Sequence, residues 1–290
     1  MRAKLLILLG TLLMCFISES TAIERRYIAP IEESKWTVTT ASRLHCEMEH
    51  VIPYFGKAIF SRESGRNLRL KLITDQAFSN GLNVELVSQS PSWKSSVAPI
   101  KLANLETTGQ SAWLDIPNRV AKLTYLELHD GFQLGFFFAK NRKLYDSMSV
   151  FLSTVRFRDA ESAFEKCVNG LYPIHYDDVK FAKIHFGNNE EFPLMADEQA
   201  AFSEMLAYLG VDKSIKEIII SGYADQTGSV CYNETLTSRR AWYIYDLLVQ
   251  LGVDPDLLRV NYYGESKLLQ KGNSAGDQAA NRRVTVELIR

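Results

Sequence analysis

The 290-residue sequence has little net charge, few cysteines, and no apolar run as long as the roughly 20 residues that a membrane-spanning helix needs. Its formal net charge of -1 provides no overall positive field for binding nucleic acid. A nucleophile elbow, an H-E-x-x-H pair and a P-loop are all missing, so we do not expect an enzyme. What is present, 46% hydrophobic and 23% charged residues, is the composition of an ordinary folded protein long enough for two domains.

The N-terminal stretch MRAKLLILLGTLLMCFISESTA has two basic residues, an apolar run from Leu5 to Ile17, and a small polar segment. This order is typical of a secretory signal peptide, with Ser20 and Ala22 suited to the cleavage pockets. We therefore predict a signal peptide over residues 1–22 and an exported mature chain that begins near Ile23. The alternatives are a membrane anchor, for which the run is too short, and a lipoprotein acylated at Cys15, which the large residues before it disfavour.

Removal of this segment leaves three cysteines, Cys46, Cys167 and Cys231. Disulfides persist in exported proteins, so one bridge and one free thiol are expected, and three pairings are possible. Cys231 lies in a predicted Gly-rich turn of the second half, whereas the other two lie near the ends of the first half. We therefore favour a Cys46–Cys167 bridge, which would contribute on the order of 4 kcal/mol in the chain-entropy view of disulfides.

Short alternating runs fill the first half of the chain. Leu68, Leu70 and Leu72 share one face of an expected strand, and turn-forming clusters such as SRESGRN and HDG separate such runs. One helix is expected over RDAESAFEKCVNG, where Asp159 can cap and Gly170 can end it. This half is therefore predicted to be β-rich.

Strands and helices alternate after residue 175. The expected strands are VKFAKIHFG, IKEIIISGYA, LLRVNYYG and RRVTVELIR, and the expected helices are ADEQAAFSEMLAYLG and one that opens near Leu236 and ends at Gly252. A βαβαββ order of this length predicts a two-layer α+β sandwich. We therefore predict a β-rich domain over residues 23–175 and an α+β domain over residues 176–290.

The stretch SGYADQTGSVCYNETLTSRRAW places Asp225 in a turn after an expected strand, and Arg239 and Arg240 on the helix that follows. Because the turn folds back, we expect the Asp225 carboxylate to face Arg240. Taken alone, this pair would be an ordinary solvated salt bridge. A carboxylate beside a guanidinium can instead hold a ligand that carries both an ammonium and a carboxylate group.

A series of motifs favours the ligand. In order along the chain, GYADQTG, YNETLTSRRAW, YYGES and NRRVTVEL resemble the OmpA-like peptidoglycan-binding domain. The resemblance implies that the domain grips diaminopimelate in the peptidoglycan stem peptide, and that Arg239 is only a solvated neighbour. The implied binding residues are Asp225 and Arg240, which hold the two charged ends of the ligand, and Asn281, Arg282 and Arg283, which border the site.

The sequence departs from this family at Tyr223 and Ala224, which stand where the family has His and Thr. A donor hydroxyl is thereby lost next to Asp225. Because the charge pair remains, we expect the site to be kept and its affinity for the wall to be weaker.

Other candidate sites have simpler interpretations. His45, Cys46, Glu49 and His50 are residue types that can bind zinc, but their spacing matches no tetrahedral pattern and the disulfide would use Cys46, so no metal or cofactor is predicted. Asn233 begins a formal glycosylation sequon, although its place in the YN motif favours a turn or capping role. The NRR cluster is too small to indicate nucleic-acid binding in a near-neutral chain.

The first domain carries a second resemblance. The run IERRYIAPIEESKWTVTTASRLHCEMEHVIPYFGKAIFSRESGRNLRLKL, followed by PSW, GQSAW and FEKCV, is similar to the MotY family of the sodium-driven polar flagellar motor. This resemblance implies a periplasmic protein of the flagellar basal body, with a disulfide between Cys46 and Cys167. Its first domain would bind MotX and the P ring or LP ring as part of the T ring, while its second domain would hold peptidoglycan. The ring would recruit and anchor a PomA/PomB-type stator.

Two other functional classes stay open. A general envelope scaffold would bind the wall without any motor role, and a peptidoglycan-modifying enzyme is a weaker third reading. The swimming behaviour of a deletion strain separates the first two.

Overall fold

The computed structural model describes residues 23–109, 111–139, 146–193 and 199–290. The signal peptide predicted over residues 1–22 lies outside the described residues. None of the helices in the described ranges is long and apolar enough to cross a membrane. The chain forms two compact units, one of residues up to 35, 50–58 and 71–157 and the other of residues 36–49, 59–70 and 158–290.

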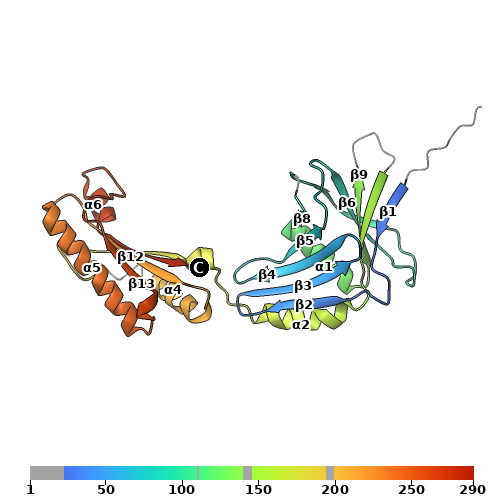
Figure 1. Ribbon diagram of the computed structural model, residues 1–290, viewed down its shortest axis with the longest axis horizontal. Coiled ribbons are helices and arrows are strands. Elements are labelled where there is room, and N and C mark those ends of the chain that lie inside the picture. Colours follow the sequence, from blue (N-terminus) through green and yellow to red (C-terminus); the bar gives the residue numbers. More distant parts are fainter. Residues whose placement is uncertain (1–22, 110, 140–145, 194–198) are drawn as a thin grey trace, which may run out of the picture. The chain divides into compact units, whose positions relative to one another are not determined.

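A five-stranded sheet lies in the first unit (Figure 1). Its strands are β1 (Ile23–Tyr27), β6 (Asn83–Gln89), β7 (Ile100–Glu106), β9 (Gln133–Ala139) and β10 (Asp146–Leu152), in the order β1-β10-β9-β6-β7. Strand β1 runs parallel to β10, whereas β9 is antiparallel to both of its neighbours. Buried residues alternate along β6, where Val84 pairs with Phe138 of β9 and Leu86 with Phe136. The predicted alternation therefore builds the core on one face of this sheet.

Helix α1 (Asn118–His129) packs against this sheet and was not among the expected elements. It buries Leu128, and the carboxylate of Glu127 accepts a hydrogen bond of 2.6 Å from the Ser88 hydroxyl of β6. Pro117 precedes the first helical residue and Gly131 follows the end at a positive φ of 80°. These are ordinary helix start and stop signals, so the helix was predictable from its ends.

A second five-stranded sheet has the order β2-β3-β4-β5-β8. Its strands are β2 (Trp36–Ala41), β3 (His45–Ile52), β4 (Gly56–Glu63), β5 (Arg69–Thr74) and β8 (Trp113–Ile116). The predicted helix in this half is confirmed as α2 (Phe157–Asn169). Asp159 lies inside its first turn, where a carboxylate favours the positive end of the helix dipole, and is not the cap.

The predicted disulfide is confirmed. Cys46 in β3 is bonded to Cys167 in α2, with 5.9 Å between their Cα atoms. The bridge closes a loop across 121 positions and ties the last helix of the β-rich region to a central strand. Cys231 is free and exposed, and it lies in a helix where a turn was expected.

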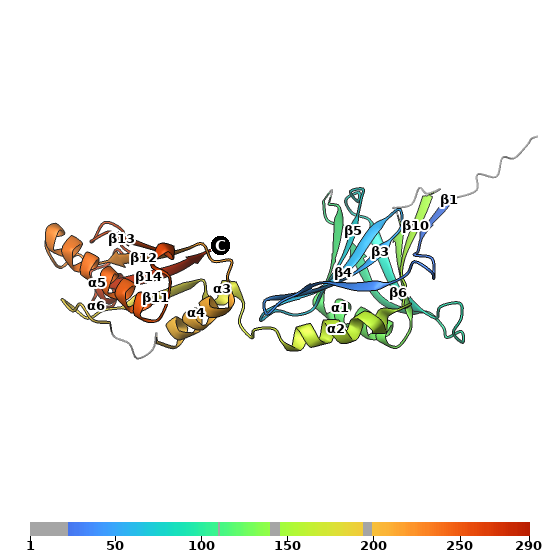
Figure 2. The same ribbon diagram turned by 60° about the horizontal axis from the view of Figure 1, so that its bottom comes forward.

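The C-terminal region is the predicted two-layer α+β sandwich. Its elements are β11 (Phe181–His185), α4 (Gln199–Val211), β12 (Glu217–Tyr223), α5 (Val230–Gln250), the short 3-10 turn η1 (Pro255–Leu257), β13 (Leu258–Tyr262), α6 (Ala275–Asn281) and β14 (Arg283–Ile289). The sheet order is β11-β14-β12-β13, and Figures 1 and 2 show α4 and α5 against this sheet. Helix α6 is additional to the expected βαβαββ order, and a capping box of Ser274 and Asp277 explains its start.

The core of this sandwich comes from both layers. Ile218 and Ile220 of β12 pair in register with Leu288 and Val286 of β14, and all four are fully buried. The α4 and α5 side chains that cover them include Met205, Tyr208, Ile244 and Leu248. Helical and strand periodicity therefore place the same apolar residues in one core.

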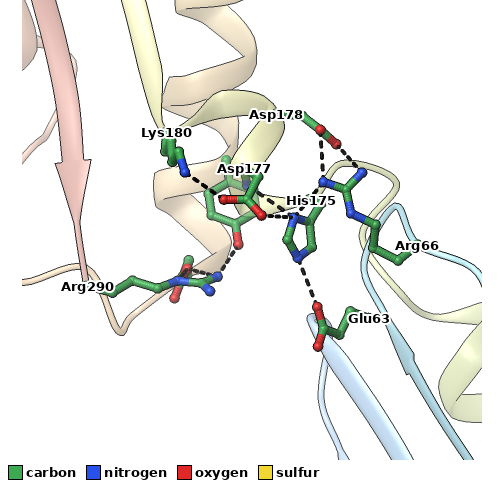
Figure 3. A network of polar contacts seen from close by, with 9 residues as sticks. Glu63, Arg66, His175, Asp177, Asp178, Lys180 and Arg290 are labelled. Atoms are coloured by element: carbon green, nitrogen blue, oxygen red, sulfur yellow. Dashed lines mark hydrogen bonds and ion pairs between the residues drawn. The ribbon is translucent and has the colours of Figure 1, made fainter. Parts of the chain in front are cut away.

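The short helix α3 (Tyr176–Val179) begins at a polar network (Figure 3). His175 caps it, because its Nδ1 accepts the backbone N–H of Asp177 at 3.1 Å. Its Nε2 lies 2.9 Å from the Glu63 carboxylate, so the tautomer with the proton on Nε2 satisfies both contacts. Arg66 donates to both carboxylate oxygens of Asp178, at 3.1 and 3.2 Å. A planar guanidinium holds a carboxylate in this two-point manner.

Breaking the disulfide should destabilise the fold and expose one thiol. Replacing Cys46→Ser removes a cross-link whose loop-closure entropy corresponds to about 5 kcal/mol. We expect a lower urea midpoint and one additional titratable thiol in the oxidised protein, at Cys167. The matched control, Cys231→Ser, should leave the midpoint unchanged and remove the thiol that is free in the wild type. An unchanged midpoint in Cys46→Ser would contradict this.

Candidate functional site

The turn that carries Asp225 follows β12 and lies against α5. Gly222 makes the close approach possible, since a Cβ atom at this position would lie 2.4 Å from the carbonyl oxygen of Thr237 in α5. The Asn233 amide fixes the turn by donating to the backbone carbonyl of Asp225 at 3.0 Å and to the Glu265 carboxylate at 2.7 Å. The strand end and the helix therefore hold the turn between them.

Asn233 is itself only 3% exposed, and both of these bonds use its amide nitrogen. Glycosylation of that nitrogen is incompatible with this burial. The residue lies inside α5, which begins at Val230 after the Ser229 cap and not near Leu236 as expected. Asn233 thus fixes the turn, as the YN motif suggested, but from within the helix.

The Asp225 carboxylate is buried, with 3% of the residue exposed, and both oxygens accept hydrogen bonds. Oδ1 accepts from the backbone N–H of Thr227 at 3.1 Å and from its hydroxyl at 2.6 Å. Oδ2 accepts from Nη1 of Arg282 at 2.9 Å. Burial acts to raise the pKa of Asp225, but the bonds from Thr227 and Arg282 outweigh it and hold that pKa below its ordinary value. The side chain is therefore ionised at neutral pH.

Arg240 is fully buried on α5. Its Nε donates to the carbonyl of Glu190 at 2.8 Å, and its Nη2 donates to the carbonyl of Gly187 at 2.9 Å. The guanidinium carbon lies 5.0 Å from the centroid of the Phe186 ring. Among the described residues Nη1 has no hydrogen-bond partner. A buried donor of this kind is uncommon in native proteins and indicates a place for an acceptor.

The electrostatics of Arg240 connect it to the other two charges. Burial and then the like charge of Arg282 lower the pKa of Arg240 to about 10, while the Asp225 carboxylate acts in the opposite direction. Arg240 is therefore still a cation at neutral pH. Arg240 was expected to face Asp225, but the guanidinium that bonds this carboxylate is that of Arg282.

Together, Asp225, Arg240 and Arg282 form a charge cluster of one carboxylate and two guanidinium groups. Arg282 has 16% of its side chain exposed, and its Nε also donates to the carbonyl of Phe186 at 3.2 Å. Such a cluster can bind an ammonium on its carboxylate and a carboxylate on its guanidinium groups. The sequence missed Arg282 as the bonded partner, since an arginine 57 positions away gives no local signal.

Asn281 and Arg283 flank Arg282 but their side chains serve the loop before α6. The Asn281 amide oxygen accepts the backbone N–H groups of Leu269 and Gln270 at 2.8 and 3.0 Å, and its nitrogen donates to the Gln270 carbonyl at 2.8 Å. Arg283 donates to the carbonyl of Lys267 at 3.5 Å. These two residues thus shape the loop that borders the cluster.

Tyr223 and Ala224 have structural roles at the family's His and Thr positions. The Tyr223 ring stacks on Tyr263 with 5.3 Å between centroids, and the Arg283 guanidinium covers it at 3.9 Å. Ala224 is 2% exposed and donates its backbone N–H to the Gly264 carbonyl at 2.8 Å. The Thr227 hydroxyl, two residues beyond Asp225, gives the carboxylate a donor despite the alanine.

The remaining candidates lie elsewhere. Arg239 is 62% exposed at its side chain and pairs with Glu191 at 2.7 Å, away from the charge cluster. Cys46 is in the disulfide and so is not a metal ligand. Over the ranges that the structure covers, no three His, Cys, Asp or Glu side chains are arranged to hold a metal ion.

Each half of the chain matches a known protein family. Residues 27–173 match the MotY N-terminal domain. The chain belongs to the MotY family. Residues 188–282 match the OmpA family, and this matched range includes the Asp225 turn, α5 and Arg282. The chain is thus a MotY-type flagellar protein with an OmpA-like C-terminal domain, as the motifs indicated.

Individual proteins are similar to the whole chain or to its C-terminal part. The chain is 25% identical to the sodium-type flagellar protein MotY of Vibrio parahaemolyticus over 99% of its own length and 98% of that protein. The peptidoglycan-associated lipoprotein of Legionella pneumophila is 36% identical over 23% of this chain and 38% of its own length. A crystal structure of the peptidoglycan-associated lipoprotein from Burkholderia pseudomallei is 25% identical and covers 37% of this chain and 90% of that one, with a TM-score of 0.34.

Acid should weaken the fold through Asp225. Because its folded pKa lies below its unfolded value of about 3.9, the carboxylate contributes stability above that value, and this is lost as the pH falls through the folded pKa. Urea unfolding at pH 6, 5, 4 and 3 should show a steeper fall for the wild type than for Asp225→Asn. The control Asp246→Asn, an exposed α5 position, should follow the wild type. Equal slopes for the wild type and Asp225→Asn would contradict this account.

Proposed function

We propose that the C-terminal OmpA-like domain binds peptidoglycan through diaminopimelate of the stem peptide. The observation that carries the proposal is the buried Arg240, whose Nη1 has no partner among the described residues. The Asp225 carboxylate is near enough for its charge to raise the pKa of Arg240. The free end of diaminopimelate bears an ammonium and a carboxylate on one carbon. It therefore offers Arg240 Nη1 an acceptor, and it brings a second cation to the Asp225 carboxylate that Arg282 already bonds.

Each residue has a distinct role in this proposal. Asp225 accepts hydrogen bonds from the ligand ammonium, and Arg240 donates Nη1 to the ligand carboxylate. Arg282 orients the Asp225 carboxylate through its 2.9 Å bond and adds positive charge beside the ligand. Asn281 and Arg283 border the site by holding the loop at residues 267–270 in place. The role is one of binding, so no catalytic residue is assigned.

At the level of the whole chain, we infer a structural role in the flagellar motor. A β-rich domain over residues 23–175 docks on the basal body, at the P ring or LP ring, and binds MotX in the T ring. An α+β domain over residues 176–290 fastens this ring to peptidoglycan in the periplasm. The ring then recruits and anchors a PomA/PomB-type stator. The support is the likeness to a sodium-type flagellar protein across 99% of this chain.

Wall binding is tested by pelleting the protein with purified sacculi. Removing Arg240 or Asp225 takes away one charged partner of the ligand. Arg240→Ala and Asp225→Ala should therefore each lower the apparent affinity for sacculi at least about tenfold, which is measured from the fraction of protein that pellets. The matched control is Arg239→Ala, the exposed neighbour of Arg240, which should pellet like the wild type.

Circular dichroism and the urea midpoint show whether a variant is folded, because truncating one member of a buried charge cluster can also destabilise the protein. Asp225→Asn and Arg240→Lys keep the volume of each side chain and serve as second variants. If folded forms of both alanine variants pelleted as well as the wild type, the site assignment would be wrong.

The motor role is tested by deleting the gene. A stator exerts torque only when it is anchored, so the deletion strain should stop swimming while its filaments are still assembled and its envelope stays intact. Swimming speed in soft agar and under the microscope, with filaments counted by electron microscopy, measures this. Normal swimming would leave a general wall-bound scaffold as the better description.

A further inference from the structure

A pocket of about 300 Å³ lies at one end of the five-stranded sheet in the first unit. Strands β1, β6 and β10 end here and β9 begins here, because Gln89 pairs with Gln133 and Leu152 with Leu134. The segments that follow β1 and β6 complete the wall, with Ile31 and Trp93 among the lining residues. This pocket is made entirely within the first unit and shares no residue with the charge cluster.

The floor of the pocket contains a donor without a partner. Gln133 lines the pocket and is 6% exposed, and its Nε2 has no hydrogen-bond partner among the described residues. A buried amide N–H left unpaired is unfavourable, because it loses its hydrogen bonds to water and gains no other. Native structures rarely keep such a group without a reason, so an acceptor from outside this chain is expected there.

The mouth of the pocket is apolar and exposed. Ile31 and Trp93 line it and are 56% and 55% exposed, and Val97, which is 49% exposed, donates its backbone N–H to the lining residue Ser90 at 3.0 Å. Large exposed apolar side chains around a small pocket are typical of a protein interface, and tryptophan is enriched among the residues that dominate binding. The volume is at the lower end for small-molecule sites and suits a single side chain of a partner.

The charge at the pocket has one sign. Arg26 lines it, with its guanidinium carbon 4.5 Å from the centroid of the Phe151 ring, and it is exposed. Of the described residues that line the pocket, none is acidic. The stacked guanidinium and the Gln133 amide are both donors, so the complementary group is a carboxylate or a carbonyl oxygen.

We propose that this pocket docks an acidic segment of a protein of the flagellar basal body. The segment places one apolar side chain in the pocket, beside Trp93 and Ile31, and an oxygen acceptor against Gln133 Nε2, with a carboxylate near Arg26. The inference rests on the proposed function, which gives the β-rich domain a docking role, and it adds the surface and the chemistry of the docked segment.

The test uses the full-length protein and basal bodies purified from the deletion strain. Wild-type protein should co-sediment with them. Trp93→Ala and Arg26→Glu should each weaken co-sedimentation at least about tenfold, since the first removes the apolar rim and the second reverses the charge. Trp93 is more than half exposed, so its truncation leaves the core unchanged.

The matched control is Arg25→Glu, which makes the same charge reversal one position away in β1, on the opposite face of the strand and outside the pocket lining. It should co-sediment like the wild type. Gln133→Glu, which replaces the unpaired donor by an acceptor, should behave like Arg26→Glu, with Gln76→Glu as its exposed control.

The outcomes separate the two levels of the proposal. If the wild type co-sediments and the pocket variants do so equally well, the pocket is not the docking site and the docking role itself stands. If Arg25→Glu loses binding as much as Arg26→Glu, the effect is one of general charge and the pocket is again excluded. If the wild type does not co-sediment at all, the docking role fails and this inference fails with it. Sacculus pelleting should be unchanged in every pocket variant.

Discussion

The buried guanidinium of Arg240 is a strong constraint on the structure of the C-terminal domain. Taking a cation out of water is costly, and it is tolerated only where hydrogen bonds and opposite charge replace the lost solvent. Here the carbonyls of Gly187 and Glu190, the face of Phe186 and the nearby Asp225 carboxylate share that role. The segment after β11, the turn after β12 and the middle of α5, where Arg240 lies, must therefore keep their places together. Nη1 of Arg240 has no hydrogen-bond partner in the described part of the chain, so the arrangement that holds the domain together also leaves a donor for an anionic group.

Much of the fold was predictable from periodicity and turn chemistry. The α+β sandwich, the β-rich first half, helix α2 and the Cys46–Cys167 bridge all follow from patterns that span a few residues or from the redox environment. The misses were the helices α1, α3 and α6 and the early start of α5 at Val230. In each case a capping or stop signal was present, but α3, α6 and the first turn of α5 are short or polar and give little apolar periodicity. From local propensity alone, such a segment is predicted to be a turn.

The candidate site was predictable in its residues but not in its bonding. Asp225, Arg240 and Arg282 lie on three elements that meet only in the folded sheet, so sequence spacing could not show that Arg282 reaches Asp225 first. Nor could it show that Tyr223 stacks between Tyr263 and Arg283. The pocket at Gln133 had no sequence signal at all, because its lining comes from the ends of four strands and the segments next to them. Motifs identify which residues belong to a site. The contacts among those residues depend on how the strands and helices pack, which a single sequence does not show.

The disulfide has a mechanical consequence under the proposed function, in which the chain is held at both ends. If the wall holds the C-terminal domain and the basal body holds the β-rich domain, a pulling force reaches the β-rich domain through the backbone at residue 170. Cys167 lies only three residues before that point. The disulfide would transfer that load to Cys46 near the start of β3, so most of α2 would lie outside the path of the force. The backbone under tension is shortened, and a helix that would otherwise unwind turn by turn is spared. A disulfide in this position suits an anchor that carries a repeated load, because the covalent connection holds even when the helix beside it unfolds.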